Sequence, residues 1–333
     1  MTATDTDKAP PRSPFNVASF LQRFGTFGMF IVLAIVASFW SDVFLTERNI
    51  VNVLRQVAAG TGIMAVGMLF VILTGGIDLS VGSIAALGSV LVAVFIAKMG
   101  FGTFGAITLT IAAGAACGLV TGFFVAFVKL PPFVISLAMM AIARGLSLIV
   151  SNGQPIMLGD GGAAIAAFGA GSLEIGPLSV PWPVVLMVSI FAVAATVLSY
   201  TRFGRLVKAI GSNQEAVRLS GIRVGWYLLS VYVISGSLAA LAGIIAASRT
   251  TVGSAQVGVG AELDVIAAVV IGGASLMGGR GGIFNTFLGA MIIGIIGNIM
   301  NLGGVPGYHQ QVYTGLIIIV AMLIQYSSHA LKR

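Results

Sequence analysis

Charged residues are scarce in this chain of 333 residues. Lys, Arg, Asp and Glu together make up 8% of the sequence, whereas hydrophobic residues make up 58% and the mean hydropathy is +1.06. So few charged groups cannot cover the surface of a water-soluble globule of this size. The composition therefore excludes a soluble domain and predicts an integral membrane protein.

Cysteine and histidine are nearly absent as well. The single cysteine, Cys117, has no partner for an intrachain disulfide, and its small neighbours indicate a packed residue. Neither His309 nor His329 has a cysteine or an acid at the spacing of metal ligands. The glycine-rich segment 278–282 lacks the lysine and hydroxyl of a phosphate-binding loop. We expect no catalytic site, metal site or cofactor in this chain.

Long apolar runs fill most of the sequence. A helix needs about 17 to 25 residues to cross a bilayer. Ten runs of about this length predict an all-α, polytopic bundle of about ten transmembrane helices, which forms a single domain over residues 25–333. The expected spans are residues 25–44, 57–73, 79–97, 104–128, 133–150, 183–199, 228–247, 262–275, 283–300 and 312–326.

The basic residues are concentrated in one loop between apolar runs. Residues 202–223 contain five Lys or Arg residues and one acid, Glu215, whereas the connection 151–182 contains two acids and no base. Loops rich in Lys and Arg stay on the cytoplasmic side of a membrane. This asymmetry predicts an even number of spans with both termini in the cytoplasm.

The net charge of +7 follows from the same topology, because most bases face the cytoplasm and anionic lipid. It therefore indicates no nucleic-acid partner. Lys98 and Arg249 are exceptions that fall on the outer side. Residues 1–24 hold three prolines among polar residues, which predicts a disordered cytoplasmic tail before the first span.

The basic loop also carries a helix signal. Ser212 followed by Glu215 has the spacing of a capping box, residues 214–219 can form a short helix, and Gly221 can end it. The simpler interpretation is a loop that only anchors the topology. The ordered helix favours a cytoplasmic docking element made of Ser212, Asn213, Glu215, Ala216, Arg218, Leu219 and Gly221.

A carboxylate interrupts the apolar pattern at residues 74–82, where Asp78 follows Gly75-Gly76. Ionisable groups at membrane depth usually pair or line a polar cavity. Asp78 or Ser80 can cap the next helix, and Asp78 can also line a pathway; the two roles are compatible. A related glycine break recurs at residues 271–282. Transporters use such discontinuous helices to expose backbone groups to a polar substrate.

Several polar residues lie in or beside the expected spans. Their amide and carboxylate groups can hydrogen-bond a passing solute, or equally a neighbouring helix. The candidate pathway residues are Asn52, Gln56, Asp78, Asn298 and Asn301.

Several long motifs together resemble the membrane permease of monosaccharide ABC importers, the group for ribose, xylose, arabinose and galactose. They are LTGGIDLSVGSIAALGS (73–89), KLPPFVISLAMMAIARG (129–145), NGQPI (152–156), the 201–224 loop and AELDVIAAVVIGGASLMGGRGG (261–282). The resemblance covers nearly all of the chain after residue 24. It leaves open which sugar is carried.

The resemblance implies a permease homodimer in the bacterial cytoplasmic membrane, with a fold similar to the cobalamin-importer type. A separate cytoplasmic ATPase subunit would bind ATP and Mg²⁺ and act on the 201–224 loop, and an extracytoplasmic sugar-binding protein would deliver the solute. The permease would form the path by alternating access. The alternative is an ion-coupled secondary transporter of small polar solutes that uses Asp78 as its coupling carboxylate. The sequence contains no set of catalytic groups at membrane depth, so it does not indicate an integral membrane enzyme.

Overall fold

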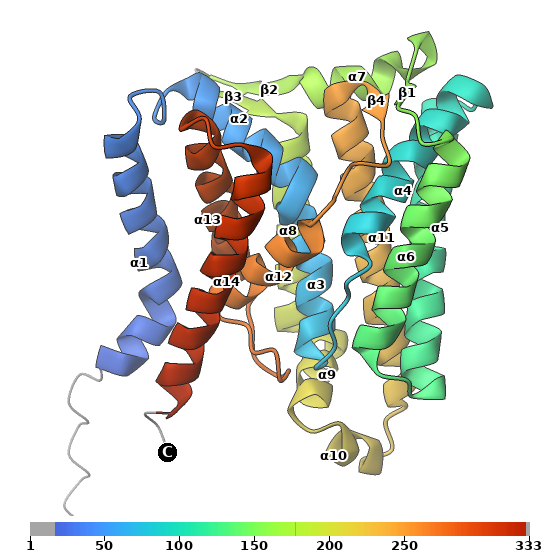
Figure 1. Ribbon diagram of the computed structural model, residues 1–333. Coiled ribbons are helices and arrows are strands. Elements are labelled where there is room, and N and C mark those ends of the chain that lie inside the picture. Colours follow the sequence, from blue (N-terminus) through green and yellow to red (C-terminus); the bar gives the residue numbers. More distant parts are fainter. Residues whose placement is uncertain (1–16, 177, 331–333) are drawn as a thin grey trace, which may run out of the picture.

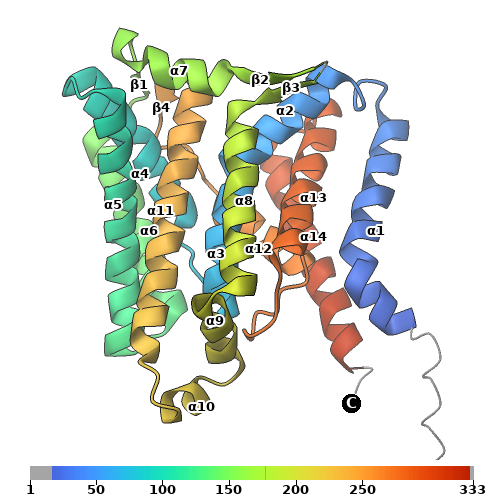
Figure 2. The same ribbon diagram turned by 180° about the vertical axis from the view of Figure 1, so that it is seen from behind.

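The computed structural model describes residues 17–176 and 178–330, and it consists of long helices aligned in one bundle (Figures 1 and 2). The helices are α1 (Val17–Trp40), α2 (Glu47–Val57), η1 (Ala58–Gly62), α3 (Ile63–Leu73), α4 (Val81–Ala93), η2 (Val94–Lys98), α5 (Thr103–Phe123), η3 (Phe124–Val128), α6 (Pro132–Ser151), η4 (Asp160–Gly162), α7 (Ala163–Ala170), α8 (Trp182–Tyr200), α9 (Arg202–Ser212), α10 (Gln214–Leu219), α11 (Val224–Thr250), α12 (Ala261–Ile271), α13 (Ile283–Leu302) and α14 (Gly307–Ala330). The strands are β1 (Ile156–Met157), β2 (Ser172–Ile175), β3 (Leu178–Pro181) and β4 (Val252–Gly253).

Seven helical segments in the described part of the chain are long and apolar enough to cross a membrane. They are Glu47–Leu73, Val81–Lys98, Thr103–Val128, Pro132–Ser151, Trp182–Tyr200, Val224–Thr250 and Ile283–Leu302. The other three expected spans fall on α1, α12 and α14. The polytopic helical bundle is therefore confirmed. Helix α1 begins at Val17, and the rest of the expected tail, residues 1–16, lies outside the described residues.

The core is built around α3, α4 and α11. Every residue of α3 is buried, and so are nearly all residues of α4. A helix that is apolar on all sides is surrounded either by other helices or by lipid. Here other helices surround α3 and α4, and α11 packs against α3, α4 and α5. The large side chain of Tyr232 on α11 is completely buried in this core.

Glycines set the distance between α5 and α11. A Cβ atom on Gly114 would overlap the carbonyl oxygen of Gly236, and a Cβ atom on Gly118 would overlap that of Tyr232. Small residues let two helix backbones approach closely, and dispersion contacts then replace a hydrophobic driving force that lipid cannot supply. Close helix packing therefore accounts for the glycines at positions 114 and 118.

Two non-helical segments interrupt the bundle, and they enter it from opposite ends (Figure 1). Residues 74–80 lead from the end of α3 into α4, and residues 254–260 lead from β4 into α12. Gly258 of the second segment meets Gly82, the second residue of α4, and a Cβ atom on either residue would overlap the carbonyl oxygen of the other. Helices α4 and α12 therefore both begin inside the bundle.

Asp78 holds the first of these segments. Its Oδ1 atom accepts hydrogen bonds from the backbone N–H of Ser80 (3.0 Å) and from the Ser80 hydroxyl (2.5 Å). Its Oδ2 atom accepts one from the Ser235 hydroxyl on α11 (2.8 Å). These hydrogen bonds turn the chain just before α4 and tie the turn to α11. The Asp78 side chain is 1% exposed and lies inside the core.

Short strands cover the end of the bundle opposite α10 (Figures 1 and 2). Strands β2 and β3 form an antiparallel hairpin, and β1 pairs with β4 through Ile156 and Gly253. The sequence analysis predicted helices alone and missed these strands, because two to four residues give too short a pattern. The start of α1 and the end of α14 lie at the α10 end of the bundle.

We predict that Asp78→Asn keeps most transport activity, whereas Asp78→Ala loses it. An amide oxygen can still accept the hydrogen bonds from Ser80, and the Ser235 hydroxyl can reverse and accept from the new amide N–H. Alanine leaves buried groups unsatisfied at a cost of about 1–3 kcal/mol each. Membrane yield, thermal stability and solute uptake measure the difference, and equal loss in both variants would contradict the structural role.

The opposite positions of the 151–182 connection and α10 predict opposite labelling. Gln154 and Ser220 are both exposed, one at each end of the bundle. With Cys117→Ala as background, Gln154→Cys should react with an impermeant thiol reagent in intact cells. Ser220→Cys should react only after permeabilisation, because we expect its basic loop to face the cytoplasm. Positions 154 and 220 lie on opposite sides only if the chain crosses the membrane an odd number of times between them. Reaction of both cysteines in intact cells would refute this.

Candidate functional site

A cavity of about 410 Å³ lies between α2, η1, α12, α13 and α14. It is the more polar of the two main cavities in the described part of the chain. The polar side chains that line it are Gln56, Thr61, Asp264, Gln310, Gln311 and Thr314. Gln56 and Gln311 are also exposed, so the cavity is open on one side.

A break in the long second helix shapes one wall. Gly60 has φ −108° and ψ −111°, which no regular helix contains, and it lies in the wide turn η1. Such π-type turns bulge out of a helix and often occur at functional sites. Gly60, Gln56 and Thr61 all line the cavity at this bulge. Gly294 of α13 also lines the cavity and packs directly against Val57. A Cβ atom on Gly294 would overlap the valine side chain.

Asp264 is the one charged residue of the lining. It lies in the first turn of α12, where the positive end of the helix dipole stabilises a carboxylate. No hydrogen bond or ion pair reaches this carboxylate from the described residues, and no Lys, Arg or His lines the cavity. The carboxylate is therefore available to hydrogen-bond donors of a molecule inside the cavity.

The structure separates the five candidate pathway residues. Gln56 lines the cavity, and Asn52 lies one turn earlier on the same side of α2 and is exposed. Asn301 accepts a hydrogen bond from the cavity residue Gln310 (2.8 Å). The pathway role of these three remains a prediction.

The other two candidate pathway residues are occupied by contacts within the protein. Asn298 on α13 exchanges two hydrogen bonds with Asn49 on α2, at 3.0 and 2.9 Å, and both side chains are buried. Asp78 is bound to Ser80 and Ser235 and is not part of the cavity lining.

Sequence reasoning missed Thr61, Asp264, Gln310, Gln311 and Thr314. For Asp264 a signal existed, because an acid inside an apolar run is itself an indication of a functional site. Gln310 and Gln311 precede the last apolar run, and Thr314 lies near its beginning. Only the packing of α14 against α12 reveals that these three side chains face the cavity.

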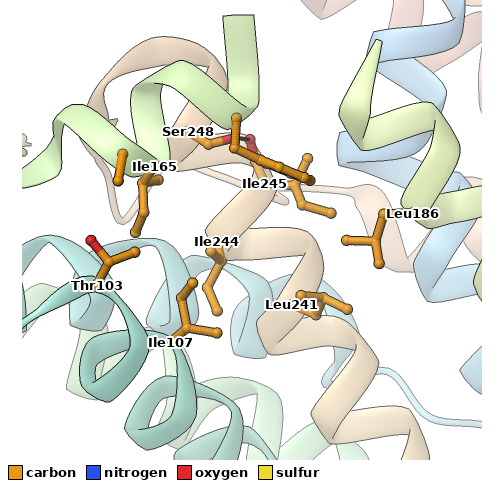
Figure 3. A pocket seen from close by; sticks show the side chains of 10 residues that line it. Thr103, Ile107, Ile165, Leu186, Leu241, Ile244, Ile245 and Ser248 are labelled. Carbon is orange, nitrogen blue, oxygen red and sulfur yellow. Dashed lines mark hydrogen bonds between the residues drawn. The ribbon is translucent and has the colours of Figure 1, made fainter. Parts of the chain in front are cut away.

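A second cavity of about 350 Å³ lies between α5, α7, α8 and α11 (Figure 3). Ile107, Leu186, Ile244 and other aliphatic side chains point into it, with Thr103 and Ser248 at its edge. Such a lining offers almost no hydrogen bonds and suits hydrocarbon rather than a polar solute. It is therefore not the candidate site for a hydrophilic solute.

The expected docking helix is present as α10, Gln214–Leu219, but its cap differs from the prediction. Asn213 is extended and its side chain accepts the N–H of Ala216 at 2.9 Å. Ser212 is still helical, as the last residue of α9, and its hydroxyl donates to the carbonyl of Lys208. The predicted Ser212–Glu215 capping box is therefore wrong by one residue.

Glu215 and Arg218 form an exposed ion pair on α10. The hydrogen bond from Arg218 holds the pKa of Glu215 below its usual range, so the pair persists at neutral pH and is lost only as the pH falls through that lowered pKa. Leu219 on the same helix is 75% exposed, and Gly221 follows it with φ +84°.

Helix α9 connects α10 to the interior of the bundle. A Cβ atom on Gly211 would overlap the carbonyl oxygen of Leu73, the last residue of α3. The same oxygen accepts a hydrogen bond from the N–H of Gly279 at 2.9 Å, in the loop between α12 and α13. Displacement of α9 therefore acts directly on the end of α3 and on the loop that follows α12.

The sequence comparisons identify relatives over nearly the whole chain. Residues 49–323 match the family described as the branched-chain amino acid transport system / permease component. The ribose import permease protein of Escherichia coli K12 is 41% identical, with 94% of this chain and 96% of that protein covered. The corresponding ribose permease of Bacillus subtilis is 42% identical, with 91% and 92% covered.

A further relative is named as the permease of an L-arabinose ABC transporter from Azospirillum brasilense, which is 36% identical with 95% of this chain and 91% of that protein covered. No solved structure matches the chain. Family membership makes the chain a transport subunit and not an enzyme, with ATP hydrolysis in a separate subunit. The protein belongs to the permease family of sugar-importing ABC transporters.

Proposed function

We propose that this protein forms the membrane path of an ATP-driven importer for a monosaccharide or a similar polyhydroxylated solute. The polar cavity beside α12 carries the proposal, because it offers amides, hydroxyls and one carboxylate and no basic group. An amino acid, which the family description mentions, could pair its ammonium group with Asp264, but its carboxylate would find no cation among the described lining residues. A neutral sugar has no such unpaired charge, and the sugar permeases among the relatives support this choice of solute.

Three further crossings by α1, α12 and α14 would bring the count to ten, as in the cobalamin-importer type of permease. Helix α12 has 11 residues, which at 1.5 Å per residue reach only about half of a hydrocarbon core of about 30 Å. The non-helical segment 254–260 would complete this crossing. The basic α9–α10 loop would then face the cytoplasm together with both ends of the chain, in the inner membrane.

A second copy of the chain would complete the path. The cavity is open at Gln56 and Gln311, and the α14 residues Val312 and Leu316 are more than half exposed. A homodimer would close this side and present a pair of α10 helices to the ATPase subunit. An extracytoplasmic binding protein would dock at the opposite end, over α7 and the β2–β3 hairpin.

The ATPase subunit would bind ATP and Mg²⁺ and act on α10. The coupling surface would consist of the helix and its caps: Ser212, Asn213, Glu215, Ala216, Arg218, Leu219 and Gly221. Motion of α10 would pass through Gly211 to Leu73 and Gly279, and from there to α12 at the cavity. The ion-coupled alternative gains no support, because Asp78 is hydrogen-bonded within the core and away from the cavity.

The function is tested in proteoliposomes that contain this permease, its co-encoded ATPase and its co-encoded binding protein. ATP-dependent uptake of one or more labelled pentoses or hexoses, with no uptake of labelled leucine, is the expected result. Uptake of leucine alone would overturn the solute class. Sugar uptake that needs an ion gradient and proceeds without ATP would overturn the transport mechanism.

We predict that Leu219→Asp abolishes coupling while the protein still reaches the membrane. A charge at this exposed apolar position opposes burial against a partner but does not disturb the core. Uptake should fall at least about tenfold and the ATPase should no longer copurify with the permease. Leu219→Met, which keeps the apolar surface, is the matched control. Normal uptake by Leu219→Asp would refute the docking role.

Gly211→Val should interrupt transmission while α10 remains intact. The added side chain overlaps the Leu73 carbonyl, so α9 must shift away from α3 at a cost of about 1–3 kcal/mol. The ATPase should still copurify, but uptake should be lost. Gly145→Ala on α6 is the control, because no atom lies within 4 Å of its new Cβ. Equal uptake in both variants would show that the contact does not transmit motion.

A further inference from the structure

The carboxylate of Asp264 is the one unneutralised charge in the lining of the cavity. Glu262, two residues earlier on α12, adds a second negative charge nearby. Arg144 of α6 is close enough to Glu262 to interact with it electrostatically. Arg144 donates its hydrogen bonds to the carbonyl oxygens of Ala255 and Val257 and so holds the non-helical segment 254–260. The cavity therefore has a negative potential.

The uncharged polar groups around Asp264 supply hydrogen bonds of both kinds. The Gln310 side-chain N–H groups already donate to Asn301 and to the carbonyl of Val305, which leaves its oxygen as an acceptor. The amides of Gln56 and Gln311 and the hydroxyls of Thr61 and Thr314 can donate and accept. A neutral solute with several hydroxyl groups satisfies this mixture, and its hydroxyls can donate to both carboxylate oxygens.

From this arrangement we infer that Asp264 is a specificity-determining residue of the permease itself. Its carboxylate accepts hydrogen bonds from solute hydroxyls and excludes solutes that carry a carboxylate or phosphate group. The inference rests on the proposed function, because it requires that the solute pass through this cavity. It adds a second selection step behind the extracytoplasmic binding protein, and this step acts on charge.

The charge of the cavity can be measured without any binding protein. With Cys117→Ala as background, Gln311→Cys places a thiol in the cavity wall of the purified full-length permease in lipid nanodiscs. The reaction rate of this thiol is measured with a cationic methanethiosulfonate reagent, which carries a trimethylammonium group, and with an anionic one, which carries a sulfonate group. Each rate is divided by the rate of the same reagent with a free thiol in solution. The cation-to-anion ratio should be about tenfold or more with Asp264 present. Asp264→Asn should bring it close to one.

Glu262→Gln is the matched control, because it removes a neighbouring charge whose side chain is not part of the cavity lining. It should lower the ratio much less than Asp264→Asn. D-ribose and D-xylose serve as neutral probes at millimolar concentration. They should slow the reaction of the Gln311→Cys thiol both in the protein that keeps Asp264 and in Asp264→Asn. They should slow it less in Asp264→Ala, because this variant has no side-chain oxygen that accepts hydrogen bonds from the sugar.

An unchanged ratio in Asp264→Asn would overturn the charge selection, even if sugar uptake in proteoliposomes remains normal. A Gln311→Cys thiol that reacts with neither reagent would show that the cavity is not on an aqueous path. That result would overturn both this inference and the proposed pathway. Asp264→Asn could also lose sugar uptake while its cation-to-anion ratio falls to near one and sugars still slow the thiol reaction. That result would support the charge selection and would place the uptake defect in a later transport step.

Discussion

The contact between Gly82 and Gly258 is the constraint on which the rest of the structure depends. In lipid, backbone N–H and C=O groups must be satisfied inside the protein, so non-helical segments survive only when they are enclosed. Segment 254–260 lies against the first turn of α4 here, because neither glycine has a side chain. Around this contact Asp78, Ser136 and Arg144 bind backbone groups that a continuous helix would have satisfied internally, and Ser235 holds the Asp78 carboxylate. The interrupted helices α4 and α12 exist because of this enclosed contact.

The sequence predicts much of the fold, because hydrophobic length and charge asymmetry are strong local signals. Each of the ten expected spans lies on a helix, and the short helix of the basic loop lies at residues 214–219, as expected. The cap was displaced by one residue, since Ser212 and Asn213 are both good caps and only the backbone conformation selects between them. The cavity was harder to predict. Asn298 and Gln56 look equivalent in sequence, but one is paired with Asn49 and the other faces open space.

The position of Leu73 joins the α9–α10 loop to the helices around the polar cavity. Its carbonyl oxygen lies between Gly211 and Gly279, so α9, the end of α3 and the α12–α13 loop share one contact. Close backbone packing of this kind has little room to deform. A displacement of α9 would therefore reach α12 through backbone contacts, without a chain of flexible side chains between them.

The reciprocal amide pair of Asn49 and Asn298 has a consequence for how the cavity changes shape. Two buried hydrogen bonds fasten α2 to α13 on one side of the cavity, and a third, from Asn49 to the Phe44 carbonyl, orients the Asn49 amide. Separation of these helices would leave the amide of Asn298 and the Oδ1 atom of Asn49 without partners in a medium that contains no water. The α2–α13 wall of the cavity is therefore fixed by these hydrogen bonds, and a change in the shape of the cavity has to come from its other walls.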